Sequence, residues 1–500
     1  MAKICLCLTG PTIEKNLQAL DRYRSLVDLA ELRVDFLDPQ ERFRIRSFPE
    51  QAGIPTILSV RRRHDGGRFD QGEGVRLVIL AKGLAFAESD PRKNFAYVDI
   101  ENDLQIPAIQ EAARIFGTRV IRSRYCLDGT PTDLENVWQS VSSSPFEIPK
   151  LAVNTRSIHD TERLFRFFGS MDNEQERIVV GMGEYGLCTR VLCDLTGSMF
   201  GYASAMGSGL EPSAPGQIDP DALRSVYCFG EAGPDWNLYG ILGGIPVLGS
   251  LSPRIHSAGF SAAGIKARYL PFPADDLDSF MRLAELLEVR GFSITAPFKE
   301  KILPRLSRRS PEVDAIGACN TAVRTERGWD GYNTDAHGFR KAVLQFMGAR
   351  DLKGIRACIV GAGGAARSVA YVLLELGAEA CVINRGITRA KRLAETYGLP
   401  WAGMTERAVD IIERYNDLII QTTSVGMEGG PPGDPLEWYQ FTGKEALFET
   451  IYNPQETALL RRARESGCRV TNGRSMLMAQ AAAQFSLFTG KEYPESASLS

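Results

Sequence analysis

A glycine-rich run in the second half of the chain has the residue types of a dinucleotide-binding turn. It reads Gly361-Ala-Gly363-Gly-Ala-Ala366 and follows a short apolar segment at 357–360. Gly361 permits a tight turn, Gly363 lets the backbone approach a pyrophosphate, and Ala366 allows a helix to pack closely on a strand. The helix expected at 368–376 would offer unpaired N–H groups to the phosphates. The run therefore predicts a nicotinamide dinucleotide and hydride transfer.

The residues expected beside the adenosine ribose favour a phosphorylated dinucleotide. The next apolar segment, 381–384, ends about 20 residues after the turn, where the ribose lies in this fold. An acid there would favour NAD, but the chain has Asn384-Arg385, with Arg389 and Lys391 nearby. Because a guanidinium binds a 2′-phosphate through two parallel hydrogen bonds, NADP is the expected cofactor. The alternative for Arg385 is a surface arginine at a strand end.

A second set of chemically capable residues lies in the first 220 positions. Glu31 and Arg33 stand at the end of one apolar segment, and Arg61 follows the next. Lys150 stands in a later apolar segment, and Arg190 follows the one after it. A charged group on a buried strand is costly unless it is compensated, so Lys150 is a candidate functional residue. Arg33 and Arg61 have the alternative role of structural partners for Glu31.

Eight strand-like segments would position this set, and most are followed by an amphipathic stretch. Repeated strand–helix units imply a parallel sheet, and eight units imply a closed (β/α)8 TIM barrel with its active site at the carboxyl ends of the strands. An open doubly wound sheet is the alternative. The expected strands are 4–8, 29–34, 56–60, 97–100, 119–123, 150–153, 178–181 and 199–203.

Two joints divide the rest of the chain. Residues 211–235 and 348–354 are rich in turn-forming residues. The helix expected at 476–487 is amphipathic, and we expect it to fold back onto the middle segment. The fold class is therefore α/β, a barrel followed by a two-lobed dehydrogenase with a C-terminal Rossmann domain. The expected bounds are 1–222 for the barrel, 223–236 for a linker, 237–345 plus 475–492 for a substrate lobe and 346–474 for the cofactor lobe.

Composition narrows the class of protein. The 500 residues carry a net charge of −3, which gives no electrostatic footprint for nucleic acid. The sequence lacks an apolar stretch of about 18 residues, the length that a membrane span would need. Gly10-Pro11 ends the N-terminal apolar run, which we interpret as a strand rather than a signal peptide. The ten cysteines and four histidines show no paired or metal-ligand spacing, so we expect no metal and a cytoplasmic location.

Ordered motifs in residues 238–490 resemble the shikimate dehydrogenase family. They are Gly249-Ser250-Leu-Ser252-Pro253, Ser293 to Lys299, Gly317 to Thr321, Gly331 to Asp335, Gln421 to Met427, Tyr452-Asn-Pro454 and Gly473 to Gln480. The resemblance implies that Lys299 donates a proton to the developing alkoxide and that Asp335 orients it. Gln421 and Ser257 depart from asparagines that are usual in the family.

The same resemblance implies the binding residues. Ser250 and Ser252 would bind the substrate carboxylate, and Thr295, Asn320 and Gln480 the ring hydroxyls. Quinate dehydrogenases resemble this family closely and are the alternative for the substrate, although paired serines are more typical of the shikimate form. The cofactor residues would be Gly361, Gly363, Gly364, Ala365, Ala366, Asn384, Arg385, Arg389 and Gly473.

The first 220 residues resemble type I 3-dehydroquinate dehydratase. The resemblance is carried by Glu31-Leu-Arg33-Val-Asp35, Arg61, Lys150, Arg190 and the segment Ser213 to Gln217. It implies that Lys150 forms an imine with the substrate ketone, which acidifies the neighbouring carbon before water is expelled. Arg190, Ser213 and Gln217 would hold the carboxylate or hydroxyls, and Glu31, Arg33 and Arg61 would line the floor.

One position departs from that family. Its general acid–base histidine falls on Tyr125 in Ser123-Arg-Tyr125-Cys. A tyrosine titrates near ~10 rather than ~6.5, so it is a poor base at neutral pH. Loss of a general base costs roughly 10²–10⁴-fold in rate, and the substitutes are Tyr125 itself, a water or His64.

Three functions follow from these resemblances. The first is a bifunctional shikimate-pathway enzyme that makes 3-dehydroshikimate in the barrel and reduces it with NADPH, in the domain order of plant enzymes. The second is a shikimate or quinate dehydrogenase whose barrel has become weak or inactive. The third is a regulatory protein similar to fungal repressors of quinate use. The retained Lys299, Asp335 and glycine turn argue against the third.

Overall fold

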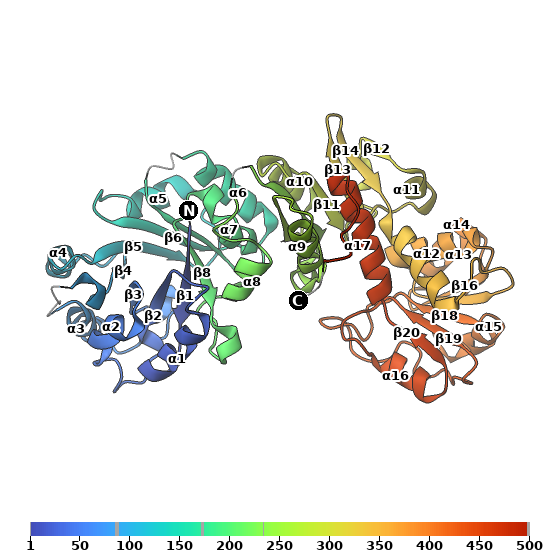
Figure 1. Ribbon diagram of the computed structural model, residues 1–500, viewed down its shortest axis with the longest axis horizontal. Coiled ribbons are helices and arrows are strands. Elements are labelled where there is room, and N and C mark those ends of the chain that lie inside the picture. The colour runs from blue at the N-terminus through green and yellow to red at the C-terminus, as the bar shows by residue number, and fades with distance from the viewer. Residues whose placement is uncertain (1, 86–89, 172–174, 234, 498–500) are drawn as a thin grey trace. The chain divides into compact units, whose positions relative to one another are not determined.

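The computed structural model describes residues 2–85, 90–171, 175–233 and 235–497 (Figure 1). Contacts divide the chain into two compact units. The first comprises Met1–Leu238 and Lys266–Glu288, and the second comprises Tyr239–Ile265 and Val289–Ser500.

Eight parallel strands form the sheet of the first unit. Their order is β7-β6-β5-β4-β3-β2-β1-β8, and a parallel bridge between Arg177 and Ser198 joins the two ends. The expected barrel is therefore confirmed, and the open doubly wound sheet is wrong. The strands are β1 (Lys3–Leu8), β2 (Leu29–Arg33), β3 (Thr56–Ser59), β4 (Tyr97–Glu101), β5 (Arg119–Cys126), β6 (Ile148–Asn154), β7 (Ile178–Met182) and β8 (Phe200–Ser204).

Helices surround this sheet (Figure 1). Side chains at their N-termini fix where several of them begin: Ser157 accepts a hydrogen bond from the Asp160 N–H, and Asp133 accepts one from the Asn136 N–H. The main helices are α1 (Ile13–Tyr23), α2 (Phe48–Ala52), α3 (Glu73–Leu84), α4 (Pro107–Ile115), α5 (Leu134–Val141), α6 (Ile158–Gly169), α7 (Leu187–Val191) and α8 (Pro220–Ser225). Strand β10 (Ala267–Pro273) and helix α10 (Leu277–Leu286) group with this unit.

Alternate residues of the barrel strands point inward and fill the interior. Ile121, Ile148, Ile178 and Phe200 belong to one buried cluster. Because side chains on a strand alternate between its two faces, the residue two positions after Ile148, Lys150, also points inward. The alternation along β6 therefore places the Lys150 side chain in the barrel interior, one step along the strand from the apolar core.

The second unit begins with a mixed sheet. Within this unit its order is β9-β11-β13-β14-β12, with β9 parallel to β11 and β13 antiparallel to both of its neighbours. The strands are β9 (Asn237–Gly243), β11 (Gly291–Ile294), β12 (Arg308–Arg309), β13 (Thr321–Thr325) and β14 (Gly328–Tyr332). The helices are α9 (Ser252–Ala262), α11 (Pro311–Ile316), α12 (Thr334–Met347) and α17 (Arg474–Thr489).

A six-stranded parallel sheet completes the second unit. Its order, β17-β16-β15-β18-β19-β20, is the 3-2-1-4-5-6 arrangement of the Rossmann fold. The strands are β15 (Arg356–Val360), β16 (Glu379–Asn384), β17 (Trp401–Gly403), β18 (Leu418–Gln421), β19 (Ala446–Glu449) and β20 (Arg469–Thr471). The helices are α13 (Gly364–Glu375), α14 (Ile387–Tyr397), α15 (Val409–Arg414) and α16 (Ala458–Glu465).

The last helix, α17, differs from its expectation in one respect. It returns to the substrate-lobe segment and packs on α12 and α9, as expected. It is not amphipathic, however, because buried side chains such as Leu477, Ala479 and Phe485 lie on more than one side of it. Packing against several elements removes the need for a polar face. No helix in the described part of the chain is long and apolar enough to cross a membrane.

Candidate active sites

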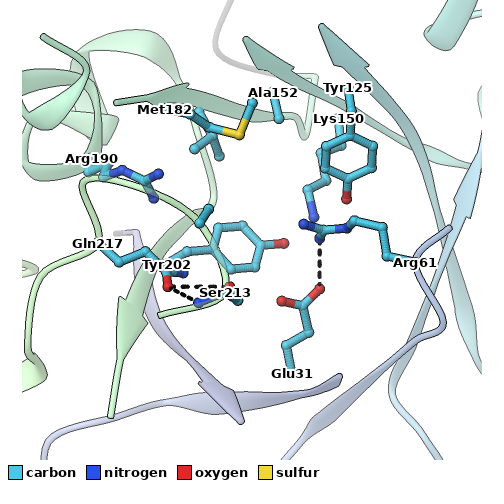
Figure 2. A pocket seen from close by; sticks show the side chains of 12 residues that line it. Glu31, Arg61, Tyr125, Lys150, Ala152, Met182, Arg190, Tyr202, Ser213 and Gln217 are labelled. Atoms are coloured by element: carbon cyan, nitrogen blue, oxygen red, sulfur yellow. Dashed lines mark hydrogen bonds and ion pairs between the residues drawn. The ribbon is translucent and has the colours of Figure 1, made fainter. Parts of the chain in front are cut away.

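A cavity opens among the barrel strands, and seven of the residues selected from the sequence line it (Figure 2). These seven are Glu31, Arg61, Tyr125, Lys150, Arg190, Ser213 and Gln217. The other lining residues are Ala152, Val180, Met182, Tyr202 and Ala214. Arg33 does not line it, and neither does His64, which is exposed and contacts Asp65 at 3.3 Å.

Lys150 makes a buried ion pair in this cavity. Its Nζ lies 2.6 Å from Oδ2 of Asp99, and each side chain is 3% exposed. Burial acts to lower the pKa of Lys150, but the charge of Asp99 outweighs it and holds that pKa well above the usual range. Burial acts in the opposite sense on Asp99, where Lys150 and Arg61 prevail and hold the pKa at about 2. The resting pair is therefore an ammonium and a carboxylate.

Tyr125 belongs to the same group. Its hydroxyl donates a 2.9 Å hydrogen bond to Oδ2 of Asp99, and Ser123 donates to Oδ1 at 2.5 Å. The guanidinium of Arg61 lies 4.2 Å from the centre of the Tyr125 ring. Burial raises the pKa of Tyr125, so its hydroxyl stays protonated and acts as a donor.

Glu31 lies on the opposite side of the group from this tyrosine (Figure 2). Its Oε1 lies 3.4 Å from Arg61, and its Oε2 accepts a hydrogen bond from the Cys7 thiol at 3.3 Å. Gln217 donates to Cys7 and accepts from the Ser213 N–H. The polar floor is therefore a connected network rather than a set of isolated groups.

Two buried side chains that line the cavity, Arg190 and Tyr202, have polar atoms that make no hydrogen bond within the described residues. Arg190 is 3% exposed and has no acidic partner in the described residues; it donates to the carbonyl oxygen of Pro215, and its Nε has no hydrogen bond. Burial lowers its pKa to about 10. The hydroxyl of Tyr202 likewise has no hydrogen-bond partner within the described ranges. Buried donors that lack hydrogen bonds beside a cavity are suited to binding an anionic, oxygenated ligand.

Arg33 has a different partner from the one considered from sequence. It makes two hydrogen bonds of 2.9 and 2.8 Å to Asp35, and both side chains are fully buried. Such a closed pair leaves little of the guanidinium for a substrate, so its geometry favours a structural role.

The second unit brings Lys299 and Asp335 together. Lys299 Nζ lies 2.5 Å from Oδ2 of Asp335, and Oδ1 of that carboxylate accepts a 2.7 Å hydrogen bond from Asn320. The side chain of Lys299 is 16% exposed, and that of Asp335 is 5% exposed. The lysine therefore points from a buried carboxylate toward accessible space.

Asn320 is held by its own network. It donates to Thr334 and accepts from the Thr334 N–H, and the Thr321 hydroxyl accepts from Gln484 on α17. The sequence motifs at 317–321 and 331–335 meet here because β13 and β14 pair antiparallel. Gln484 and Thr334 were not selected from the sequence.

The remaining selected substrate residues are half-buried or buried at the start of α9, after β11 and within α17. The Ser250 side chain lies near the Tyr452 hydroxyl, and its own hydroxyl accepts a hydrogen bond from the Ser252 N–H at 3.1 Å. Thr295 directly follows β11. Gln480 lies on α17 beside Gly338, where an added Cβ would meet it at 2.9 Å. No hydrogen bond is made by the Gln480 side chain within the described residues.

The glycine turn connects β15 to α13. Gly361 has φ +119, and a Cβ there would lie 2.4 Å from the Thr422 hydroxyl, so this position requires glycine. A Cβ at Gly363 would meet nothing within 4 Å, which leaves open space at the start of the helix. A Cβ at Gly364 would lie 3.0 Å from Lys299 Cδ, so the turn and the lysine are neighbours. The turn fits a pyrophosphate.

Arg385 directly follows β16, Arg389 lies in the first turn of α14, and both are exposed. Neither makes an ion pair in the described part of the chain, whereas nearby Lys391 contacts Glu395 at 3.7 Å. Asn384 donates to the Gly386 carbonyl oxygen at 2.9 Å. Two unpaired guanidinium groups fit a 2′-phosphate. Gly473 is buried where a Cβ would lie 2.1 Å from the Thr450 carbonyl oxygen.

Sequence reasoning missed Asp99, Cys7 and Tyr202 in the barrel. The available signal was strand parity: Tyr97 and Asp99 alternate on β4 in the same way as Ile148 and Lys150 on β6. Which acid faces Lys150 depends on the pairing of strands far apart in sequence.

A barrel with a buried lysine, followed by a substrate lobe and a Rossmann lobe, defines a two-site α/β enzyme class. The family model of type I 3-dehydroquinase matches residues 4–233. The shikimate dehydrogenase substrate binding domain matches 242–322, and shikimate / quinate 5-dehydrogenase matches 343–426. The chain belongs to the shikimate dehydrogenase family and carries a type I 3-dehydroquinase domain ahead of it.

Some relatives match only the second half of the chain, and others match nearly all of it. A shikimate dehydrogenase (NADP(+)) of Moorella thermoacetica is 41% identical over 50% of this chain and 88% of its own. A chloroplastic bifunctional 3-dehydroquinate dehydratase/shikimate dehydrogenase of Arabidopsis thaliana is 29% identical over 98% of this chain and 83% of its own. A solved structure of dehydroquinate dehydratase and shikimate dehydrogenase from S. pombe is 21% identical, covers 99% of this chain and 96% of its own, and has a TM-score of 0.43.

Proposed function

We propose that the second unit reduces 3-dehydroshikimate to shikimate with NADPH. The observation that carries this is the Lys299–Asp335 pair at 2.5 Å beside the glycine turn. Bound NADPH supplies the hydride. Lys299 then stabilises the developing alkoxide and donates a proton to it, while Asp335, fixed by Asn320, orients the ammonium.

The selected residues take the following parts in this proposal. Ser250 and Ser252 bind the carboxylate, and Thr295, Asn320 and Gln480 bind the ring hydroxyls. The turn from Gly361 to Ala366, with Gly473, receives the dinucleotide, and Asn384, Arg385 and Arg389 receive its ribose phosphate. The test is NADPH oxidation with 3-dehydroshikimate, followed at 340 nm (an absorbance that NADP lacks). No turnover would refute the proposal.

The barrel, in the same proposal, dehydrates 3-dehydroquinate to 3-dehydroshikimate through an imine on Lys150. The carrying observation is a buried lysine in a cavity that is also lined by Arg190, which has no carboxylate partner among the described residues. Arg190 binds the substrate carboxylate, and Gln217, Ser213 and Glu31 bind hydroxyls. The test is formation of the conjugated enone, followed by ultraviolet absorbance, with Lys150→Met as the inactive control.

Quinate is the competing substrate of the dehydrogenase. Its extra hydroxyl lies on the carbon that carries the carboxylate, so the pocket at Ser250 and Ser252 decides between the two acids. The paired serines Ser250 and Ser252 favour shikimate. Rates with shikimate and quinate, each with NADP and NAD, measure the preference.

We propose the following organisation for the chain. Residues 1–222 form the lyase domain, 223–236 a linker, 237–345 plus 475–492 the substrate lobe and 346–474 the NADP lobe. The partners are the small-molecule substrates, and the location is cytoplasmic, in keeping with ten cysteines that are all free thiols.

A further inference from the structure

The carboxylate of Asp99 touches the atom of the barrel that must react. Its Oδ2 lies 2.6 Å from Lys150 Nζ and accepts the Tyr125 hydroxyl at 2.9 Å, and its Oδ1 accepts Ser123. All four side chains are buried. Three donors therefore fix this carboxylate against the nucleophilic nitrogen.

Imine formation requires a proton acceptor at this place. An ammonium has no lone pair, so Lys150 must lose a proton before its nitrogen attacks a ketone. The family histidine that would manage this proton is absent, because Tyr125 stands at its position.

The other side chains that could accept the Lys150 proton are already protonated, already paired or outside the cavity. Tyr125 is a phenol that already donates to Asp99, and burial raises its pKa. Glu31 is engaged by Arg61 and Cys7. His64 is exposed, contacts Asp65 and does not line the cavity. Asp99 is the only carboxylate within hydrogen-bond distance of Lys150 Nζ among the described residues.

We propose that Asp99 carries the proton of Lys150 during formation and hydrolysis of the imine, and that Tyr125 positions Asp99 for this task. The role rests on the lyase activity proposed above. Figure 2 shows Lys150 and Tyr125 on one side of the cavity, with their polar ends near Arg61.

Imine formation takes two protons from the ammonium of Lys150. As the nitrogen attacks the carbonyl carbon, one N–H bond of Lys150 breaks and an O–H bond forms on Asp99. A second proton moves from nitrogen to the former carbonyl oxygen and gives a carbinolamine. Asp99 then returns its proton to the carbinolamine hydroxyl, which leaves as water. The products are an iminium on Lys150 and the original carboxylate, and hydrolysis follows the reverse course.

The test isolates imine formation from dehydration. The product, 3-dehydroshikimate, keeps the ketone, so the full chain without NADPH is incubated with it and borohydride, and the adduct at Lys150 is quantified by mass spectrometry. We expect an adduct in the unchanged chain and a rate at least ~10²-fold lower at pH 7 in Asp99→Asn. In that variant the rate should also rise steeply with pH, because hydroxide must replace the carboxylate.

Companion variants separate chemistry from folding. Asp99→Glu keeps a carboxylate and should recover part of the rate, and Tyr125→Phe should lose less than Asp99→Asn. Glu147→Gln, which removes a carboxylate paired with Arg122 outside the cavity, is the matched control and should keep the rate. Dehydrogenase turnover of each sample measures the folded fraction.

Two negative outcomes are distinguishable. No adduct in the unchanged chain would overturn the proposed lyase activity and this role with it. An adduct that forms as fast or faster in folded Asp99→Asn would overturn only the role of Asp99, because it would mean that the carboxylate merely keeps Lys150 protonated.

Discussion

The ammonium of Lys299 lies 2.5 Å from the carboxylate of Asp335, although the two residues are 36 positions apart. The contact depends on β13 and β14, which pair and return the chain to the end of β11. Asn320 holds the second oxygen of Asp335, so the carboxylate has a single orientation toward the lysine.

Lys299→Met should therefore lower kcat for 3-dehydroshikimate by about 10²–10⁴-fold, because the alkoxide loses its proton donor. The KM for NADPH should change little. Steady-state NADPH oxidation measures both. Lys301→Met, a change at a nearby exposed lysine, is the control and should leave kcat within about twofold. A loss below tenfold in Lys299→Met would contradict the assigned role.

Among the described residues Arg385 has no acidic partner; it follows β16, where the proposed 2′-phosphate lies. Arg385→Ala should raise the KM for NADP by roughly 10–100-fold, the value of one or two hydrogen bonds to a charged group, while the KM for NAD changes little. The ratio of kcat/KM for the two cofactors measures it. Arg414→Ala, an exposed arginine on α15, should leave the ratio unchanged. Equal losses with both cofactors would speak against a phosphate contact.

By its resemblance to type I 3-dehydroquinate dehydratase, Tyr125 stands at the position of that family's general base, and burial raises its pKa, so it keeps its proton. Tyr125→His should raise the dehydration rate by at least tenfold, since an imidazole can remove a proton from carbon at neutral pH. The enone assay compares the two proteins. An unchanged or lower rate would contradict this prediction and would mean that losing the hydrogen bond from Tyr125 to Asp99 outweighs the gain of an imidazole.

The strands and helices could be predicted from the sequence, but the residues that pair with the buried charged groups could not. Eight strand–helix units were sufficient for the barrel, and the turn at 361–366 was sufficient for the Rossmann sheet, because both depend on local periodicity and on glycine conformation. Arg33 shows the limit: the acids at 31 and 35 flank it equally in sequence, and only the folded strand end selects Asp35. Asp99 shows the same limit across 51 positions, since its partner is set by strand order.

Glu449, at the end of β19, gives the cofactor lobe a pH dependence. It is fully buried and accepts hydrogen bonds from Thr457 and Gln421, and burial raises its pKa to about 7. The folded state therefore keeps a proton that the unfolded state releases near pH ~4.5, so stability falls as the pH rises toward 7 and is level above it. Glu449→Gln should remove this slope.

Thermal unfolding at pH 5 and pH 8 tests the assignment. The unchanged chain should lose several degrees of Tm for the cofactor lobe between the two values beyond the loss in Glu449→Gln. Glu465→Gln, a change at an exposed acid of α16, should retain the full loss. The same pH dependence in all three proteins would show that Glu449 is not its source.

Arg190 separates stability from function in the barrel. It is a buried guanidinium with no carboxylate partner in the described part of the chain, and burial lowers its pKa to about 10, so its charge is a cost in the absence of an anion. Arg190→Met should raise the KM for 3-dehydroquinate by about 10–100-fold, because the substrate carboxylate loses a charged donor. The Tm of the barrel should stay the same or rise, since the buried charge is gone. Arg63→Met, at an exposed arginine in the segment after β3, should change neither quantity. A folded but clearly less stable Arg190→Met would indicate that this arginine serves the barrel itself rather than a ligand.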